Sequence, residues 1–239
     1  FSCKNPSHFS KSDRPNIILI NVDDLGWKDL GFMGSQYYET PFLDEFAKQG
    51  TVFTNAYASA ANCAPSRASL FSGLNTPRHG VYTVGSSERG DKRTRKLIPA
   101  KNKKYLNDSI YTFPEMLKSV GYINANFGKW HIGTLDENRS PKTARRGRPE
   151  FGAKPWERGY DYFFGTESSI STLNPQVNAF DPNAAGAETK NPYAEYNAED
   201  TNPAPSYPGG LIGDDSQIMV DRVKTFITNA ENEDKPFLA

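Results

Sequence analysis

Cysteine and histidine are scarce in this sequence, and neither sign of charge is in excess. Two cysteines, Cys3 and Cys63, can form at most one bond, which excludes a disulfide framework. The 28 basic and 28 acidic residues balance, and the basic ones are not interleaved with stacking aromatics, so nucleic acid is not an expected partner. No apolar run approaches the roughly 20 residues that a membrane-spanning helix requires.

Aromatic residues are plentiful, at 13%, although hydrophobic residues in total make up only 36% of the chain. This balance predicts a core wrapped in long polar loops, and 239 residues suffice for one large domain or two small ones. The polar start predicts a flexible N-terminal segment over residues 1–15. We expect residues 16–239 to be the N-terminal part of a longer domain, because residues 235–239 read as the first half of a buried strand.

Apolar runs alternate with helical patterns along the chain. Strands are predicted by the continuous apolar run at 16–22, which suits burial on both faces, by the alternation at 51–57, and by residues 122–127. Start and stop residues, such as Thr40-Pro41 with Gly50, predict helices at 41–49, 66–71, 113–120 and 214–230. This alternation indicates an α/β fold with a largely parallel, mixed central sheet sandwiched by helices.

Two regions read as loops. Residues 89–104 are strongly basic, and residues 174–210 are rich in Asn, Pro, Ala and Gly without a clear period. A loop as long as the second is usually functional or disordered. We therefore expect neither region to contribute a helix or strand to the domain.

Charged side chains follow two of the predicted strands. Asp23 and Asp24 come directly after the first strand, and Lys129 and His131 follow the third. Ligands of such sheets gather beyond the carboxyl ends of the strands, so these four residues can meet at one edge. Two adjacent carboxylates suit Ca²⁺ or Mg²⁺, although a helix cap or a solvated turn is the simpler interpretation of the pair alone.

Cys63 sits where a nucleophile would be useful. It is followed by Ala-Pro-Ser-Arg, and Pro65 suits the first turn of a helix. A thiol at a helix N-terminus is a natural nucleophile, and Arg67 would hold an anion near the same helix end. A small buried cysteine beside a surface arginine is the simpler explanation of a lone Cys-x-x-x-Arg pattern.

Several motifs together resemble the formylglycine-dependent sulfatases, a family with an alkaline-phosphatase-like α/β fold. The Cys-Ala-Pro-Ser-Arg run at 63–67, continued by Ser72-Gly73, is similar to the family signature. Further landmarks occur in the family's order: Asp23-Asp24, Thr40-Pro41-Phe42-Leu43-Asp44, Gly128-Lys129-Trp130-His131 and Gly159-Tyr160-Asp161. The resemblance extends from about residue 14 to residue 239.

The resemblance implies that Cys63 is oxidised to formylglycine by a formylglycine-generating or anaerobic sulfatase-maturing enzyme, which reads the unfolded chain. Asp23, Asp24 and the hydrated aldehyde at position 63 would bind Ca²⁺, or Mg²⁺ in its place. One hydroxyl of the hydrate would attack sulfur, and the other would then lose its proton and expel sulfate. Arg67 would hold the hydrate, Lys129 would bind sulfate oxygens, and His131 would take the proton.

The activity implied by the resemblance is hydrolysis of a sulfuric ester in a sulfated carbohydrate. Three alternatives stay open: a phosphonate monoester or phosphodiester hydrolase of the same superfamily, a non-catalytic sulfated-glycan binder if Cys63 is unmodified, and a plain cysteine hydrolase. His79 receives no role beyond bracing a helix end. Further metal ligands, a second histidine and a second lysine of the family pattern are expected beyond residue 239, in the remainder of the sulfatase chain.

The distribution of charge hints at the substrate. Positive residues cluster at 89–104 and 139–148, whereas acidic residues concentrate from Asp181 onward. A basic cluster near a sulfate site suits a polyanion such as a sulfated polysaccharide, and we expect Arg93 and Arg95 to contact it. An ordinary solvated loop is the alternative.

The N-terminus and the implied substrate together indicate export. Calcium use and a glycan substrate are typical of periplasmic or extracellular enzymes, and Phe-Ser-Cys at residues 1–3 resembles the remnant of a bacterial lipoprotein signal. We expect a periplasmic or extracellular protein, with Cys3 either lipid-anchored or an ordinary cysteine in a flexible tail.

Overall fold

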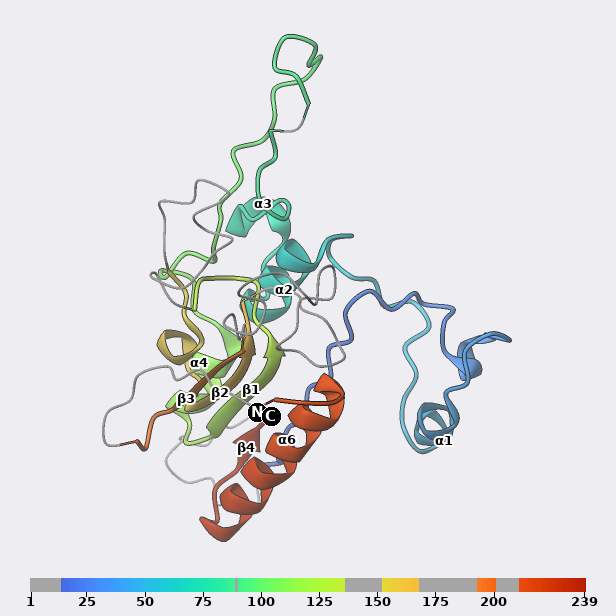
Figure 1. The fold of residues 1–239 in the computed structure, drawn as a ribbon, viewed down its shortest axis with the longest axis vertical. Helices are drawn as coiled ribbons and strands as arrows, with labels where there is room; N and C mark the ends of the chain where they lie inside the picture. Colours follow the sequence, from blue (N-terminus) through green and yellow to red (C-terminus); the bar gives the residue numbers. More distant parts are fainter. Residues whose placement is uncertain (1–13, 89, 136–151, 168–192, 201–210) are drawn as a thin grey trace, which may run out of the picture.

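A central sheet organises the computed structural model, which describes residues 14–88, 90–135, 152–167, 193–200 and 211–239 (Figure 1). Its strands are β1 (Ile123–Lys129), β2 (Tyr162–Thr166), β3 (Tyr193–Asn197) and β4 (Phe237–Leu238). Their order is β3-β2-β1-β4; β1 runs parallel to β2 and β4, and β2 runs antiparallel to β3. The predicted α/β fold with a largely parallel, mixed sheet is confirmed.

Helices form where the capping residues predict them. These are α1 (Pro41–Gln49), α2 (Cys63–Ser72), α4 (Phe113–Ser119) and α6 (Asp215–Asn232). Thr112 and Glu115 form a capping box at α4, and the Asp214 carboxylate accepts a hydrogen bond from the Ser216 N–H at 2.8 Å. Three short turns have no counterpart in the prediction: η3 (Gly31–Met33), α3 (Thr76–His79) and η4 (Pro155–Arg158). None of the helices in the described ranges is long and apolar enough to span a membrane.

Helices cover both faces of the sheet, because successive side chains of a strand point to opposite faces. Leu238 belongs to a buried cluster with Phe71 of α2 and Trp130, and α4 packs against the same cluster. Its neighbour Phe237 instead packs in a second cluster with Phe226 of α6. The predicted sandwich is therefore present, with α2 and α4 on one side of the sheet and α6 on the other.

The prediction of a buried strand at residues 16–22 is wrong for most of its length. Ile17 alone forms a β-bridge, with Leu238, and this bridge is parallel. Ile18 and Ile20 are 57% and 76% exposed. The run has a strand partner on one side only, and beyond Ile17 its apolar side chains remain exposed.

The strand predicted at residues 51–57 is also wrong. These residues have neither helix nor strand structure, and Phe53 and Tyr57 are exposed. They belong to a segment with η3 and α1 that stands apart from the sheet, at the right of Figure 1. Alternating residues need a neighbouring strand for hydrogen bonding, and the described residues offer none there.

The two predicted loops have different outcomes. Residues 90–104 contain no helix or strand, as expected for the basic loop. The second loop, 174–210, is wrong at residues 193–197, because these pair with β2 and form β3. The rest of that loop lies outside the described residues, except 198–200. The basic stretch at 139–148 and Cys3 also lie outside them.

Candidate active site

The carboxyl end of β1 is shaped by two glycines that face each other across the sheet. Gly128 of β1 lies opposite Gly165 of β2, and a Cβ on Gly165 would lie 1.7 Å from the Gly128 carbonyl oxygen. Gly128 also has a φ of +109°, a conformation that side chains rarely adopt. The two strands therefore approach closely, and the backbone leaves regular geometry just before Lys129.

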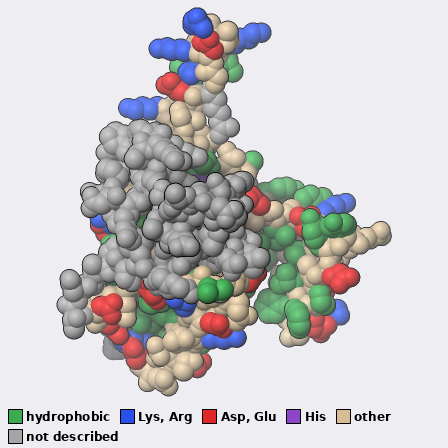
Figure 2. Space-filling model, viewed as in Figure 1, with side chains coloured by type: hydrophobic (Ala, Val, Ile, Leu, Met, Phe, Trp, Pro, Cys, Tyr) green, Lys and Arg blue, Asp and Glu red, His purple; other side chains and the backbone are tan. Residues whose placement is uncertain are grey.

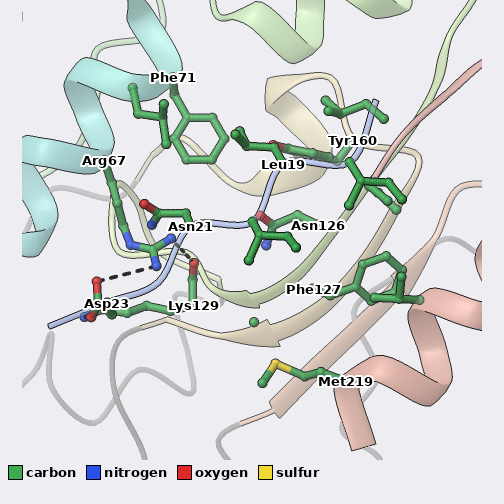
Figure 3. Close-up of a pocket in the computed structure, with 18 of the residues that line it drawn as sticks. Leu19, Asn21, Asp23, Arg67, Phe71, Asn126, Phe127, Lys129, Tyr160 and Met219 are labelled. Carbon is green, nitrogen blue, oxygen red and sulfur yellow. Dashed lines mark hydrogen bonds and ion pairs between the residues drawn. The ribbon is translucent and has the colours of Figure 1, made fainter. Parts of the chain in front are cut away.

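Asp23 lies between two cations at this edge. Its carboxylate forms an ion pair with Lys129 Nζ and a second one, at 3.6 Å, with Arg67 Nη2. Arg67 Nη1 also donates a hydrogen bond to the backbone carbonyl oxygen of Lys129 at 2.7 Å. Figure 3 shows the three side chains drawn together. Side chains from helix α2 and strand β1 thus meet at the Asp23 carboxylate. The contact between Asp23 and Lys129 is the one expected from their positions after two predicted strands.

The charges of this cluster support one another. Burial alone would raise the pKa of Asp23, but the hydrogen bond and charge of Lys129, with the charges of Arg67 and His131, hold that pKa below its usual value. Burial lowers the pKa of Arg67, while the charges of Asp23 and Cys63 act in the opposite direction. Asp23 is therefore held as a carboxylate chiefly by the two cations that contact it, Lys129 and Arg67.

Helix α2 places Cys63 and Arg67 one turn apart at its N-terminal end. Cys63 is a half-buried free thiol, and Arg67 is only 8% exposed. Ala64 and Ala68 pack into the core and fix the helix against the sheet. The positive end of the helix dipole and the guanidinium both favour an anion beside residue 63.

Asp24 and His131 have left-handed backbone conformations, with φ angles of +57° and +62°. Such angles are uncommon for residues other than glycine and cluster at functional sites. The backbone N–H of His131 donates to the Glu167 carbonyl oxygen at 2.9 Å. The His131 imidazole is near enough to Asp23 to contribute to the lowering of the Asp23 pKa. Asp24 is exposed and forms no hydrogen bond or ion pair with the other predicted site residues in the described part of the chain.

A cavity of about 470 Å³ opens beside the cluster (Figure 3). Its walls are largely apolar and come from residues 18–20, strand β1 and helix α6. Asp23, Arg67 and Lys129 meet at one end of the cavity, and Met219 lies away from them. The charged groups are therefore open to a hollow rather than sealed in the core.

The described residues include two candidate ligands for Ca²⁺. Asp23 and Asp24 are hard oxygen donors of the kind that Ca²⁺ prefers, but Ca²⁺ takes about six to eight oxygen ligands. Within the described ranges, no group of three or more His, Cys, Asp and Glu side chains could hold a metal ion. The chemistry of the two carboxylates fits the ion, and further ligands are needed to complete its coordination.

His79 lies outside the site, although it is fully buried. Its Nδ1 accepts a hydrogen bond from the Val81 N–H at 3.1 Å, so Nε2 carries the proton and donates to Ser69 Oγ at 3.0 Å. Burial, and secondarily the charge of Lys103, lower the pKa of His79. This neutral imidazole bridges α2 and the segment after α3, which agrees with a bracing role.

Two residues beside the site have no predicted function. Tyr160 lines the cavity; burial raises the pKa of its hydroxyl, and the charge of Arg67 opposes this. Asn62 precedes Cys63, and its Nδ2 donates to Thr83 Oγ1 at 3.1 Å. The sequence features that could have pointed to these residues are the position of Asn62 directly before a helix and that of Tyr160 within the Gly-Tyr-Asp landmark.

This chain is similar in sequence to known sulfatases. The human (Homo sapiens) N-acetylgalactosamine-6-sulfatase is 36% identical over 152 residues, which are 64% of this chain and 25% of that protein. A sulfatase of Formosa agariphila is 43% identical over 129 residues, 50% of this chain and 23% of that protein. The alignments thus span about a quarter of these curated relatives.

The fold and the family assignment agree. The crystal structure of the PsFucS1 sulfatase from Pseudoalteromonas sp. matches 95% of this chain and 43% of that chain, with a TM-score of 0.66 and 26% identity. The family described as Sulfatase matches residues 15–239. The match includes the aspartate, the α2 motif and the β1 end that meet in the charged cluster. This chain belongs to the sulfatase family.

Proposed function

We propose that the protein hydrolyses a sulfuric ester of a sulfated carbohydrate, using a formylglycine made from Cys63. The observation that carries the proposal is the Asp23–Arg67–Lys129 cluster next to the N-terminal end of α2, at the edge of a cavity. A relative named N-acetylgalactosamine-6-sulfatase supports a sugar sulfate as the substrate class. The cationic side chains of Arg67 and Lys129, near the N-terminal end of α2, suit an anionic sulfate group.

Each side chain has a role in this proposal. Lys129 binds sulfate oxygens as a point charge, because its ammonium is held at the cavity end. Arg67 holds the oxygens on residue 63, while its bond to the Lys129 carbonyl fixes the distance between α2 and β1. His131 takes the proton that must leave a hydroxyl on residue 63 when sulfate departs. Asp23 and Asp24 would hold Ca²⁺, or Mg²⁺, which offsets charge on the sulfate group.

Completion of the site requires more than residues 1–239 in this proposal. The further metal ligands, the second histidine and the second lysine are assigned to the remainder of a longer sulfatase chain. A formylglycine-generating or anaerobic sulfatase-maturing enzyme is the partner that modifies Cys63. In this proposal the protein acts on sulfated glycans in the periplasm or the extracellular space, and a lipid attached to Cys3 anchors it to a membrane.

The decisive experiment is mass spectrometry of the tryptic peptide 49–67 from the purified protein, followed by an aryl sulfatase assay. The expected peptide carries an aldehyde in place of the Cys63 thiol, and the protein releases sulfate from a small aryl sulfate. An unmodified thiol in an inactive protein, even after co-expression with a maturing enzyme, would indicate a sulfated-glycan binder instead.

Two further measurements separate the hydrolytic alternatives. A faster reaction with an aryl phosphonate than with an aryl sulfate would assign the protein to the phosphonate or phosphodiester hydrolases. Inactivation by a thiol-alkylating reagent would indicate a cysteine hydrolase, because formylglycine has no thiol to alkylate.

A further inference from the structure

Residues 86–88 and 90–104 form a projection, and we call the sequence 86–104 the basic finger. It extends beyond α3 as the green loop at the top of Figure 1. Its sequence contains eight Lys and Arg residues and two acidic ones, in a chain whose formal net charge is zero. Figure 2 shows blue Lys and Arg side chains pointing outward from this projection. The protein therefore concentrates positive charge on one protruding element.

The base of the basic finger is fastened next to the candidate nucleophile. Asn102 Oδ1 accepts hydrogen bonds from the N–H groups of Tyr82 and Thr83, at 2.6 and 3.2 Å. Asn102 Nδ2 donates to the carbonyl oxygens of Thr83 and Gly85, at 3.0 and 2.6 Å. Thr83 in turn accepts a hydrogen bond from Asn62, the residue before Cys63. The finger thus begins at the rim of the site.

The arginines expected to contact a polyanion form ion pairs within the finger. Arg93 pairs with Asp91 at 2.7 Å, and Arg95 pairs with Glu88 at 3.4 Å. The Arg95 side chain is only 19% exposed, and its guanidinium also donates to the Gly90 carbonyl oxygen, whereas the Arg93 side chain is 88% exposed. Contact of Arg93 and Arg95 with a polyanion stays a prediction.

Exposed lysines of the finger remain available to a ligand. Lys92, Lys96 and Lys101 are exposed and form no ion pair with any residue of the described ranges. Leu97 and Ile98, which follow Lys96, are 84% and 97% exposed. The finger therefore presents free ammonium groups at its turn, residues 92–94, and along the segment that follows the turn, with a small apolar surface between Lys96 and Lys101.

We propose that the basic finger binds the sulfated sugar chain beyond the sugar that is hydrolysed, through Lys92, Lys96 and Lys101. This inference rests on the proposed function, because it assigns a polymeric substrate to the same site. An elongated polyanion can follow an elongated row of cations from the rim of the site outward. Leu97 and Ile98 contact the apolar C–H surfaces of the sugar rings.

An anionic membrane is the competing ligand for a basic element with exposed apolar side chains. Two observations favour the sugar chain. The base of the finger is hydrogen-bonded to the residue that precedes Cys63, and the free lysines extend from the turn at 92–94 back to Lys101 rather than gathering only beside Leu97 and Ile98. A device for membrane attachment has no need of a link to the catalytic edge.

The test compares two triple variants of the protein. The finger variant carries Lys92→Gln, Lys96→Gln and Lys101→Gln. The control variant carries Lys48→Gln, Lys224→Gln and Lys235→Gln, which change net charge equally at exposed ion pairs far along the chain from the finger. Binding to heparin is measured over a series of salt concentrations, and kcat/KM is measured with a small aryl sulfate.

The finger variant is expected to bind heparin about tenfold or more weakly, with a shallower salt dependence, because three cationic contacts are lost. The control variant should bind within about twofold of the parent, and both should keep aryl sulfate kcat/KM within about twofold. Equal losses of heparin affinity in the two variants would overturn the proposal. So would binding to phosphatidylserine vesicles that requires Leu97 and Ile98, with heparin affinity unchanged in the finger variant.

The outcomes for the finger and for the proposed function are distinguishable. A protein with formylglycine at position 63 that fails to hydrolyse aryl sulfate contradicts the proposed function. The heparin comparison needs no turnover, so it decides the role of the finger in that case as well. A lysine-dependent loss of heparin affinity supports the finger, and its absence overturns it.

Discussion

The guanidinium of Arg67 joins helix α2 to strand β1 through the backbone of Lys129. Its Nη1 donates to the Lys129 carbonyl oxygen at 2.7 Å, and its Nη2 lies 3.6 Å from the Asp23 carboxylate. The Arg67 side chain is almost fully buried, whereas the Asp23 carboxylate that it contacts is partly exposed. One guanidinium therefore sets the relative positions of the predicted nucleophile, a predicted metal ligand and a predicted sulfate-binding lysine.

Arg67→Lys should reduce aryl sulfate kcat/KM by about 100-fold or more, in line with the loss of a preorganised donor in an active site. A lysine ammonium is a single point charge and cannot reproduce the planar fork that reaches two acceptors. Arg78→Lys, at an exposed arginine on α3, is the matched control and should remain active. Comparable rates for both variants would contradict the role of Arg67.

Asp23→Asn and Asp24→Asn should separate charge balance from metal binding. Asp23→Asn removes the partner of two cations and should lower the free energy of unfolding by about 1–2 kcal/mol without added calcium. Asp24→Asn should leave that free energy unchanged, because residue 24 is exposed and asparagine tolerates its left-handed φ.

Both aspartate variants should lose activity and the calcium-induced rise in Tm, measured against a sample treated with EDTA. An active Asp24→Asn protein whose Tm still rises with calcium would remove Asp24 from the metal site. Asp24→Asn is informative here because its backbone and stability should be unaltered.

The stability of the protein should fall as the pH drops below about 6.5, the ordinary pKa of histidine, partly through His79. The pKa of His79 is lowered in the folded protein, so the unfolded chain binds more protons as the pH passes below 6.5. The stabilising contribution is complete above that pH and is lost as the pH falls toward the folded-state pKa.

Urea unfolding at about pH 7.5 and about pH 5.5, roughly one unit on either side of the ordinary histidine pKa, would measure the His79 contribution. His79→Gln should be less stable than the parent at the higher pH and should show a smaller difference between the two pH values. Ser69→Ala, which removes the acceptor of the buried imidazole, should cost about 1 kcal/mol at the higher pH. An identical pH dependence in the His79→Gln variant would exclude this histidine as a source.

Gly165→Ala should destabilise the fold by about 3 kcal/mol or more, because the new Cβ would meet the backbone of β1 rather than a movable side chain. Gly50→Ala is the matched control; its Cβ would lie 3.8 Å from its nearest neighbour, the Phe46 carbonyl oxygen. Thermal unfolding of the two variants tests the close approach of β1 and β2. Equal Tm values would show that the strands separate freely at this point.

Local signals in the sequence predicted the helices well. The Thr-Pro start and the Gly stop of α1, and the Thr112–Glu115 pair at α4, are read directly from residue type and spacing. The expectation that Asp23 and Lys129 meet followed from their place after predicted strands, and the structure brings them into contact. The dual role of Arg67 was out of reach, because a backbone carbonyl carries no sequence signal.

Strand predictions failed where pairing decides the outcome. Residues 51–57 have the alternation of a strand but no partner among the described residues. Residues 193–197 lie in a segment rich in loop-forming residues, yet they become β3 because β2 offers an edge with matching register. Period and composition describe a segment in isolation, whereas a strand exists only together with its neighbour.

The parallel bonding between residues 17–19 and 237–239 has a consequence for the order of events during synthesis. Ile17 N–H donates to the Phe237 carbonyl oxygen at 2.8 Å, and Leu19 N–H donates to that of Ala239 at 2.9 Å. The backbone that leads to Asp23 cannot acquire these bonds until residue 239 has left the ribosome. At about 5–20 residues per second, synthesis from residue 19 to residue 239 takes on the order of 10–40 s. Once residues 63–67 have been made, the Cys-Ala-Pro-Ser-Arg segment therefore waits in a nascent chain in which the sheet edge of the candidate site is still unassembled.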